Sequence, residues 1–192
     1  YEECELLLAE LEKSTNVSPG TNITHALKYA EYAYNVIHIM GADLKFCRHL
    51  FLKEASLIFK ETGNYSRSIE LLNIFIPAYD EKNIEDRNIL AETYNNYSKI
   101  LSMEGHTEEA LEKALYAEKL IDSIDECHDE DYFLRKMIIK KTVAMDYAHH
   151  KQYKEALKKI EEAFENTEHI SPDFHYQIAN LYSDYARLLL DT

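Results

Sequence analysis

The chain has 192 residues, of which 46% are hydrophobic and 29% charged, and its formal net charge is −14. This balance excludes a disordered or membrane-embedded chain, and the acidity argues against nonspecific binding of nucleic acid, which requires a basic surface. Only 4 glycines and 3 prolines are present. Because an all-β fold needs frequent turn residues, we expect an all-α protein.

The sequence also carries signals about compartment. Cys4, Cys47 and Cys127 lie far apart without a C-x-x-C pair, which indicates reduced thiols in a cytoplasmic protein rather than a disulfide framework. No apolar run approaches the roughly 18–20 residues of a membrane span, and an acidic start is unlike a signal peptide. Since no Met begins the chain, we expect a fragment of a longer protein.

Apolar residues recur at helical spacing along almost the whole chain. The pattern predicts nine helices, at residues 2–13, 23–40, 43–62, 65–82, 86–104, 107–123, 130–149, 152–167 and 173–191. Gly41, Gly63 and Gly105 follow expected helix ends, where a left-handed residue is favoured. Pro77 should kink or end the helix in which it lies. Connections of two to five residues make successive helices antiparallel neighbours.

The sequence repeats itself at the helix connections. Residues 63–69, Gly-Asn-Tyr-Ser-Arg-Ser-Ile, align with residues 105–111, Gly-His-Thr-Glu-Glu-Ala-Leu, and with residues 151–157, Lys-Gln-Tyr-Lys-Glu-Ala-Leu. Residues 21–27 are a fainter copy. The aligned small residues Ala26, Ser68, Ala110 and Ala156 are separated by 42, 42 and 46 residues. A period near 40 with two helices per unit is typical of an α-solenoid.

The motif Gly-x-Tyr-x-x-Ala resembles the turn of the tetratricopeptide repeat, and the ladder Ala110, Ala114, Ala117 resembles the small-residue seam of its second helix. The period exceeds the usual 34 residues, as in the long repeats of kinesin light chain, MalT-like regulators and peptide-pheromone receptors. The resemblance implies one right-handed superhelical solenoid over residues 1–192, with about four and a half repeats. The departures are the lack of Trp, Ser68 for Ala, and Lys151 for Gly.

The last helix reads as the first half of a fifth repeat. A solenoid that ends on a half-repeat leaves an apolar face open, so we expect Leu181, Leu188 and Leu189 to pack inward while the opposite side stays apolar. A homodimer through this half-repeat is one way to cover it.

No catalytic or metal-binding motif is present. The acidic stretch 122–131 lacks the ligand spacing of a zinc site, so we interpret it as a connecting loop and an acidic first helical turn. His149 and His150 are interpreted as a helix end. Five tyrosines fall on the packing stripes of first helices and are expected in the core: Tyr94, Tyr97, Tyr147, Tyr182 and Tyr185.

The resemblance also places candidate ligand-binding residues, because the first helix of each such pair lines a concave groove at positions ten and six residues before the turn. These positions are Lys53, Leu57, Asn95, Lys99, Lys141, Met145, Ser183 and Arg187. Four of the eight are Lys or Arg, whereas the whole chain has 21 such residues in 192. Cations along a concave wall favour anionic ligands, and Asn95 matches asparagines that bond a ligand's backbone in the family.

The sequence therefore favours a non-catalytic scaffold that binds a protein or peptide, with an acidic segment or a C-terminal carboxylate as the preferred ligand. No cofactor, nucleic acid or membrane contact is expected. The alternative is a sensory, regulatory or dimerisation domain of a larger bacterial transcription regulator or signalling enzyme.

Overall fold

The computed structural model describes residues 27–28, 30–32, 34–35, 48–124 and 129–191, with the side chains of residues 48–54 outside the description. The expected helix 2–13, Ala26 and Gly41 lie outside these residues. All regular secondary structure in the described part is helical, which confirms the all-α prediction there. The chain forms two compact units, Tyr1–Tyr79 and Asp80–Thr192, which we describe separately. The single continuous domain stays a prediction.

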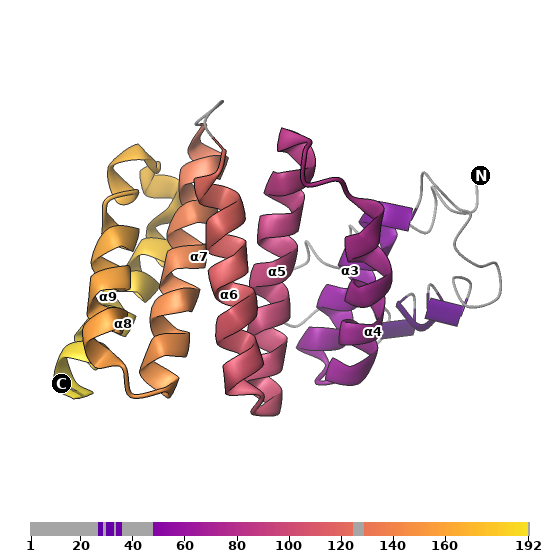
Figure 1. Ribbon diagram of the computed structural model, residues 1–192, viewed down its shortest axis with the longest axis horizontal. Coiled ribbons are helices and arrows are strands. Elements are labelled where there is room, and N and C mark those ends of the chain that lie inside the picture. The colour runs from indigo at the N-terminus through magenta and orange to yellow at the C-terminus, as the bar shows by residue number, and fades with distance from the viewer. Residues whose placement is uncertain (1–26, 29, 33, 36–47, 125–128, 192) are drawn as a thin grey trace. The chain divides into compact units, whose positions relative to one another are not determined.

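The described elements follow the sequence prediction closely. Unit 1 contains α3 (Arg48–Glu61), α4 (Tyr65–Phe75) and the 3-10 helix η2 (Ile76–Ala78), and residues described between 27 and 35 are helical. Unit 2 contains α5 (Ile84–Glu104), α6 (Thr107–Asp122), α7 (Glu130–His149), α8 (Tyr153–Phe164), η3 (Thr167–His169), η4 (Pro172–Phe174) and α9 (His175–Asp191). Figure 1 shows the consecutive helices of each unit as hairpins.

Pro77 acts as predicted. The α-helix before it ends at Phe75, and Pro77 lies near the start of η2. Proline has no N–H to continue the α-helical hydrogen bonds, so the helix expected over 65–82 stops seven residues early.

The polar residues before α5 and α7 cap these helices. Asn83 Oδ1 accepts a hydrogen bond from the Glu85 N–H at 2.9 Å, and Asp129 Oδ1 accepts one from the Tyr132 N–H at 2.8 Å. Asp129 is followed by the acidic first turn of α7, where the helix dipole favours negative charge. At the other end α7 stops at His149. The interpretations of Glu130 and Asp131 as an acidic first turn and of His149 as a helix end are confirmed, while residues 125–128 of the acidic stretch lie outside the described residues.

One hairpin turn occurs three times with the same hydrogen bonds. At Gly63, Gly105 and Lys151 the backbone is left-handed, with φ of 75°, 87° and 59°. Each of these N–H groups donates to the carbonyl three residues earlier, and the next N–H donates to the carbonyl five residues before it, at distances of 2.8–3.1 Å. This is the Schellman pattern that ends a helix. The aligned sequence segments therefore form the same structure, including the copy in which Lys151 replaces glycine.

Close packing of the hairpins explains the small residues after each turn. Ser68, Ala110 and Ala156 are fully buried on second helices. Twelve residues earlier, Ser56, Ser98 and Ala144 are buried on the first helices. In the α3–α4 hairpin the Ser68 hydroxyl donates to the Ser56 carbonyl at 2.8 Å and lies 2.8 Å from the Ser56 hydroxyl. Because both hydroxyl groups are satisfied, serine replaces alanine without leaving a buried polar atom unpaired.

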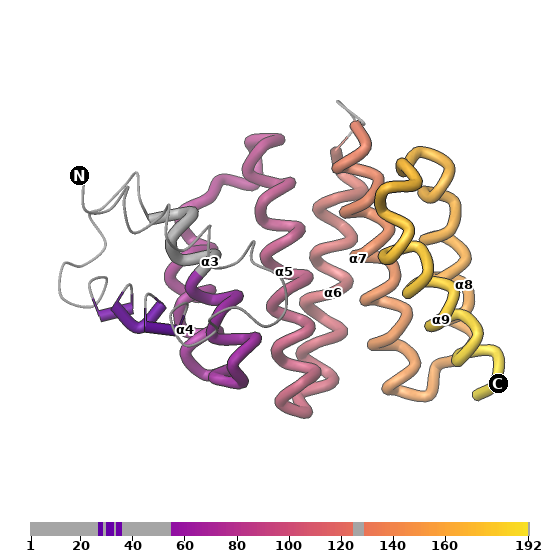
Figure 2. Tube along the Cα trace, turned by 180° about the vertical axis from the view of Figure 1, so that it is seen from behind, coloured from indigo at the N-terminus to yellow at the C-terminus, as the bar shows by residue number. Residues whose placement is uncertain are grey.

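Unit 2 is built from two rows of helices. The first helices α5, α7 and α9 contact one another in order, and α6 and α8 pack against them in the hairpins. Opposite views show α5 to α9 succeeding one another (Figures 1 and 2). Contacts between α6 and α8 are sparser than those between α5 and α7. The row of first helices is therefore the more closely spaced one.

The packing of α9 corrects two predictions. Leu181 and Leu188 are fully buried, as expected, but Leu189 is 52% exposed. Leu181 and Leu188 are seven residues apart and share one helix face, from which Leu189 is rotated by about 100°. Tyr182 was expected in the core and is 60% exposed, although its ring lies 4.7 Å from that of Phe164. The other four tyrosines of that set are half-buried.

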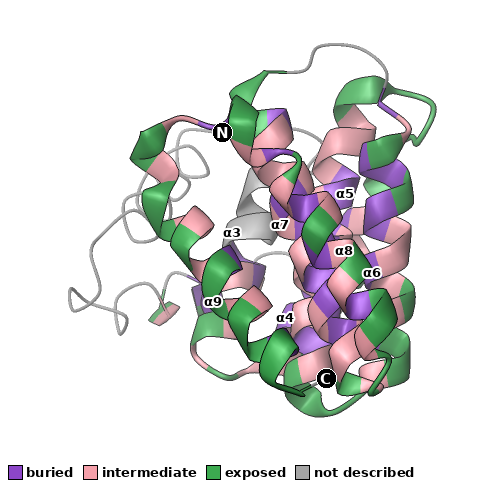
Figure 3. Cartoon of the chain, turned by 90° about the vertical axis from the view of Figure 1, so that its left-hand side faces the viewer, coloured by how far each residue is buried: buried purple, intermediate pink, exposed green. Residues whose placement is uncertain are grey.

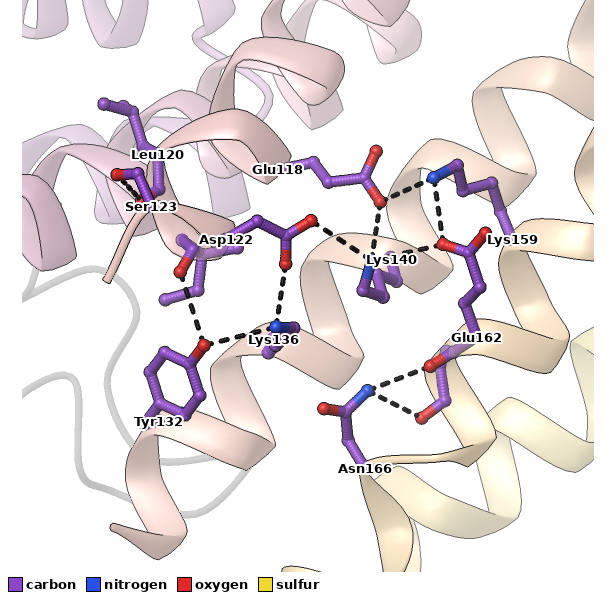
Figure 4. Close-up of polar contacts among 12 residues, drawn as sticks. Glu118, Leu120, Asp122, Ser123, Tyr132, Lys136, Lys140, Lys159, Glu162 and Asn166 are labelled. Carbon is purple, nitrogen blue, oxygen red and sulfur yellow. Dashed lines mark hydrogen bonds and ion pairs between the residues drawn. The ribbon is translucent and has the colours of Figure 1, made fainter. Parts of the chain in front are cut away.

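A buried charge network joins α6, α7 and α8 (Figure 4). Lys140 Nζ lies 2.9 Å from Glu118, 3.2 Å from Glu162 and 3.4 Å from Asp122. Burial lowers the pKa of Lys140, but the surrounding carboxylates outweigh that effect and the net pKa is raised. Lys159 completes the network at 2.9 Å from both glutamates. The network fixes α7 between two second helices.

Candidate functional site

A hollow of about 270 Å³ lies between α5 and α7. Each helix contributes four side chains at the spacing of one helical face. From α5 these are Glu92, Asn95, Asn96 and Lys99; from α7 they are Asp131, Leu134, Arg135 and Ile138. Two of the residues predicted from the sequence, Asn95 and Lys99, therefore line one hollow.

Asn95 is the most unusual residue of this hollow. Its side chain is 3% exposed, and its Oδ1 has no hydrogen-bond partner among the described residues. A buried polar atom without a partner costs about 1–3 kcal/mol, and most such atoms in folded proteins are paired. A ligand that supplied the missing donor would recover this free energy.

The charges around the hollow are balanced. Arg135 lies 3.7 Å from the Glu92 carboxylate and donates to Asn88 Oδ1 at 2.5 Å. Lys99 and Asp131 add one charge of each sign. Leu134 and Ile138 supply apolar surface from α7. The hollow is thus suited to polar backbone groups and one apolar side chain more than to a strongly charged ligand.

Next to the hollow, a buried carboxylate links α5 to α7. Asp146 of α7 is 3% exposed and accepts a hydrogen bond from the Ser98 hydroxyl of α5 at 2.6 Å. Burial raises the pKa of Asp146, while the Ser98 hydrogen bond and the charges of His149, His150 and Lys99 act in the opposite direction. Asp146 therefore holds together the helices that form the hollow.

Three further predicted residues gather around one acid that the sequence argument omitted. Asp184 of α9 lies 3.2 Å from Lys141 and 3.0 Å from Arg187. The Arg187 guanidinium lies 3.8 Å from the Met145 sulfur. Ser183 is exposed on α9. The cations here already have an anionic partner within the chain.

The remaining predicted positions belong to unit 1. Leu57 is half-buried in α3, and the side chain of Lys53 is outside the described residues. The structure thus describes one group around the hollow and a second around Asp184. The convergence of all eight residues on one surface stays a prediction.

Sequence reasoning missed all four residues of α7 that line the hollow. It compared positions at equal distance from the turn, which pairs Lys99 with Met145. The contacts between α5 and α7 keep this register, since Ser98 donates to Asp146 and Arg135 donates to Asn88. The hollow, however, is lined by the N-terminal half of α7, which the two counted positions on that helix do not sample. The lining residues 92, 95, 96 and 99 of α5 and 131, 134, 135 and 138 of α7 follow the same helical spacing. This spacing is the sequence pattern that identifies the two helix faces that line the hollow.

In sequence, the chain matches no protein family model and no curated protein. Its described residues contain no cluster of three or more His, Cys, Asp or Glu that could hold a metal ion. None of the helices in the described part has the length and apolar character needed to cross a membrane.

Proposed function

We propose that the chain is a tetratricopeptide-type scaffold that binds an extended peptide segment between its first helices. The three equivalent turns at Gly63, Gly105 and Lys151 support the repeat assignment, since they carry the same backbone bonds. The buried small residues that follow each turn support it independently. A right-handed superhelix is the architecture that such repeats form.

The spacing of the two rows supports a concave surface on the side of the first helices. A double layer in which α5 and α7 approach more closely than α6 and α8 curves with the closer row inside. The hollow lies between α5 and α7, so it opens on the inner surface of this proposed curve.

The observation that carries the proposal is the unpaired, buried Oδ1 atom of Asn95, a residue that lines this hollow. A side-chain amide both donates and accepts, so it matches a peptide group of a ligand. Leu134 and Ile138 would contact an apolar side chain of the peptide, and Lys99 would approach a carboxylate. At about 270 Å³ the hollow is smaller than typical sites for drug-sized molecules, so a short stretch of peptide fits better than a large cofactor.

We propose no catalytic role. The Ser102 hydroxyl and the Asp146 carboxylate lie 3.1 and 4.0 Å from the same nitrogen of His149, Nδ1. In a Ser-His-Asp triad the serine and the carboxylate occupy different ring nitrogens. The arrangement therefore lacks the geometry for proton relay and supports a structural role at the α5–α7 contact.

The test is selection of ligands from a random peptide library, followed by affinity measurement for variants. Asn95→Ala should weaken binding by about 3–10-fold, the effect of one hydrogen bond, and Lys99→Ala should weaken it less, because Glu92 and Asp131 also line the hollow. Lys158→Ala is the matched control, because Lys158 is exposed on α8. Circular dichroism should show that all variants are folded. A library that yields no ligand, or ligands unaffected by Asn95→Ala, would reject the proposal.

A further inference from the structure

Two hydrogen bonds set the register of α5 against α7 around the hollow. Arg135 of α7 donates to Asn88 of α5, 47 residues away in sequence. Ser98 of α5 donates to Asp146 of α7, 48 residues away. Because the residue numbers of both helices rise from the first bond to the second, the two helices run in the same direction. The hollow between them therefore has one N-terminal end and one C-terminal end.

The residues that line the two ends of the hollow carry opposite charges. Asp131 belongs to the first turn of α7, and Lys99 lies in the C-terminal half of α5. With the observed register, Asp131 is level with the start of α5, which is about 22 Å before Lys99 along the helix axis. The N-terminal end of the hollow is therefore negative, and the C-terminal end is positive.

The middle of the hollow is balanced in charge and partly apolar. Arg135 lies 3.7 Å from the Glu92 carboxylate, so these two charges compensate each other. Leu134 and Ile138 add apolar surface, and Asn95 contributes an Oδ1 atom that has no partner among the described residues. A ligand that matches the hollow therefore carries its charged side chains at its two ends and an uncharged segment between them.

Asp131 is accessible to a ligand. The exposed residues of α7 are Glu130, Asp131 and His149, at the two ends of the helix, and the positions between them are buried or half-buried (Figure 3). Glu130 accepts a hydrogen bond from the Ser171 N–H. The Asp131 carboxylate, in contrast, forms no hydrogen bond or ion pair with any residue of the described part. Asp131 can therefore attract a cation without giving up an existing contact.

We propose that the hollow selects a peptide segment with a basic side chain at the Asp131 end, an apolar side chain in the middle and an acidic side chain at the Lys99 end. This inference rests on the proposed function of the hollow as a peptide site. An extended peptide covers about 3.4 Å per residue, so about six or seven residues reach from one end to the other. Lys99 already stabilises the buried Asp146 carboxylate, so Asp131 should contribute more to the selection than Lys99.

Four peptide libraries test this order of charges. Each contains acetylated and amidated seven-residue peptides with five random central positions. They differ only in the two end residues, which are Lys and Glu in the four possible combinations. The immobilised wild-type chain should retain both mixed libraries about threefold or more better than either uniform library, because a uniform peptide replaces one surface ion pair with a repulsion. If the doubly basic library is retained best, the net charge of −14 decides and the proposal is wrong.

Exchange of the end charges tests where the preference arises. Asp131→Lys should shift the preference to the doubly acidic library, and Lys99→Glu should shift it to the doubly basic one. Glu161→Lys and Lys158→Glu are the matched controls, because they change the net charge equally at exposed positions of α8 and should keep the mixed preference. Circular dichroism checks folding. If Lys99→Glu does not fold, the exposed position 131 decides alone.

The outcomes separate this inference from the proposed function. If none of the four libraries yields a ligand, or if the ligands bind equally well to Asn95→Ala, the proposed function fails and the charge order fails with it. If the ligands depend on Asn95 but come equally from all four libraries, the hollow is a peptide site and only the charge order is wrong. An unchanged mixed preference in Asp131→Lys would overturn the charge order in the same way.

Discussion

Replacement of Lys151 by glycine should stabilise the protein. Lys151 has a left-handed backbone, with φ of 59°, in a turn whose two other copies contain glycine. A residue with a Cβ in this conformation costs roughly 1–2 kcal/mol, and the side chain is exposed, so few contacts are lost. Glycine also makes the unfolded chain more flexible, which offsets part of the gain. We therefore expect the free energy of unfolding to rise by about 1 kcal/mol, or the melting temperature by about 2–4 °C.

Urea denaturation followed by circular dichroism measures this change, and two further variants bracket it. Gly105→Ala should lower the free energy of unfolding by about 1 kcal/mol. No atom lies within 4 Å of an added Cβ there, so this cost comes from the backbone conformation alone. Lys158→Gly, in the middle of α8, should also lower it by about 1 kcal/mol. If Lys151→Gly destabilises the chain as Lys158→Gly does, the turn at 151 is not equivalent to the turn at 105.

Three other changes test the packing. Ala110→Leu should overpack the α5–α6 hairpin and lower the free energy of unfolding by about 1–3 kcal/mol, again by urea denaturation. Lys140→Ala should cost about 1.5–3 kcal/mol, because Glu118 and Glu162 lose one of their two cationic partners and keep Lys159, whereas Lys158→Ala should change little. Because the pKa of Asp146 is raised, the folded chain keeps the carboxyl proton of Asp146 to higher pH than the unfolded chain does. The stability that this proton contributes is therefore fully present below pH 3.8 and is lost as the pH rises through the raised pKa. Asp146→Asn should therefore gain stability relative to wild type as pH increases from about 4, and a difference that is constant with pH would contradict this assignment.

Local signals in the sequence were sufficient for the helices and turns. The glycines at 63 and 105, the proline at 77 and the acidic first turn of α7 each act through the backbone of a few neighbouring residues. Their effect therefore does not depend on distant parts of the chain. The turn at Lys151 agrees with this, because it keeps both backbone hydrogen bonds of the repeated turn although lysine is less favourable than glycine at a left-handed position.

The candidate site was predicted less completely because it depends on which parts of two neighbouring helices leave a hollow between them. Counting from each turn identified Asn95 and Lys99 on α5, but the counted positions on α7 lie outside the N-terminal half of that helix, which lines the hollow. Side-chain pairing was also beyond the sequence argument. Asp184 lies only three residues from Arg187, but its contact with Lys141 of another helix depends on the packing of α9 against α7.

These pairings change the expected chemistry of the ligand. Four of the eight groove positions predicted from the sequence are Lys or Arg, and this favoured an acidic peptide as the ligand. In the structure, Asp184 forms ion pairs with both Lys141 and Arg187, and the hollow contains Glu92 and Asp131 beside Arg135 and Lys99. A carboxylate ligand near Asp184 would have to displace an existing ion pair, which reduces its net gain. The buried Oδ1 atom of Asn95 has no such competing partner among the described residues. Recognition of the peptide backbone at Asn95 should therefore contribute more to specificity than the net charge of the ligand, and moderate salt should weaken binding only slightly.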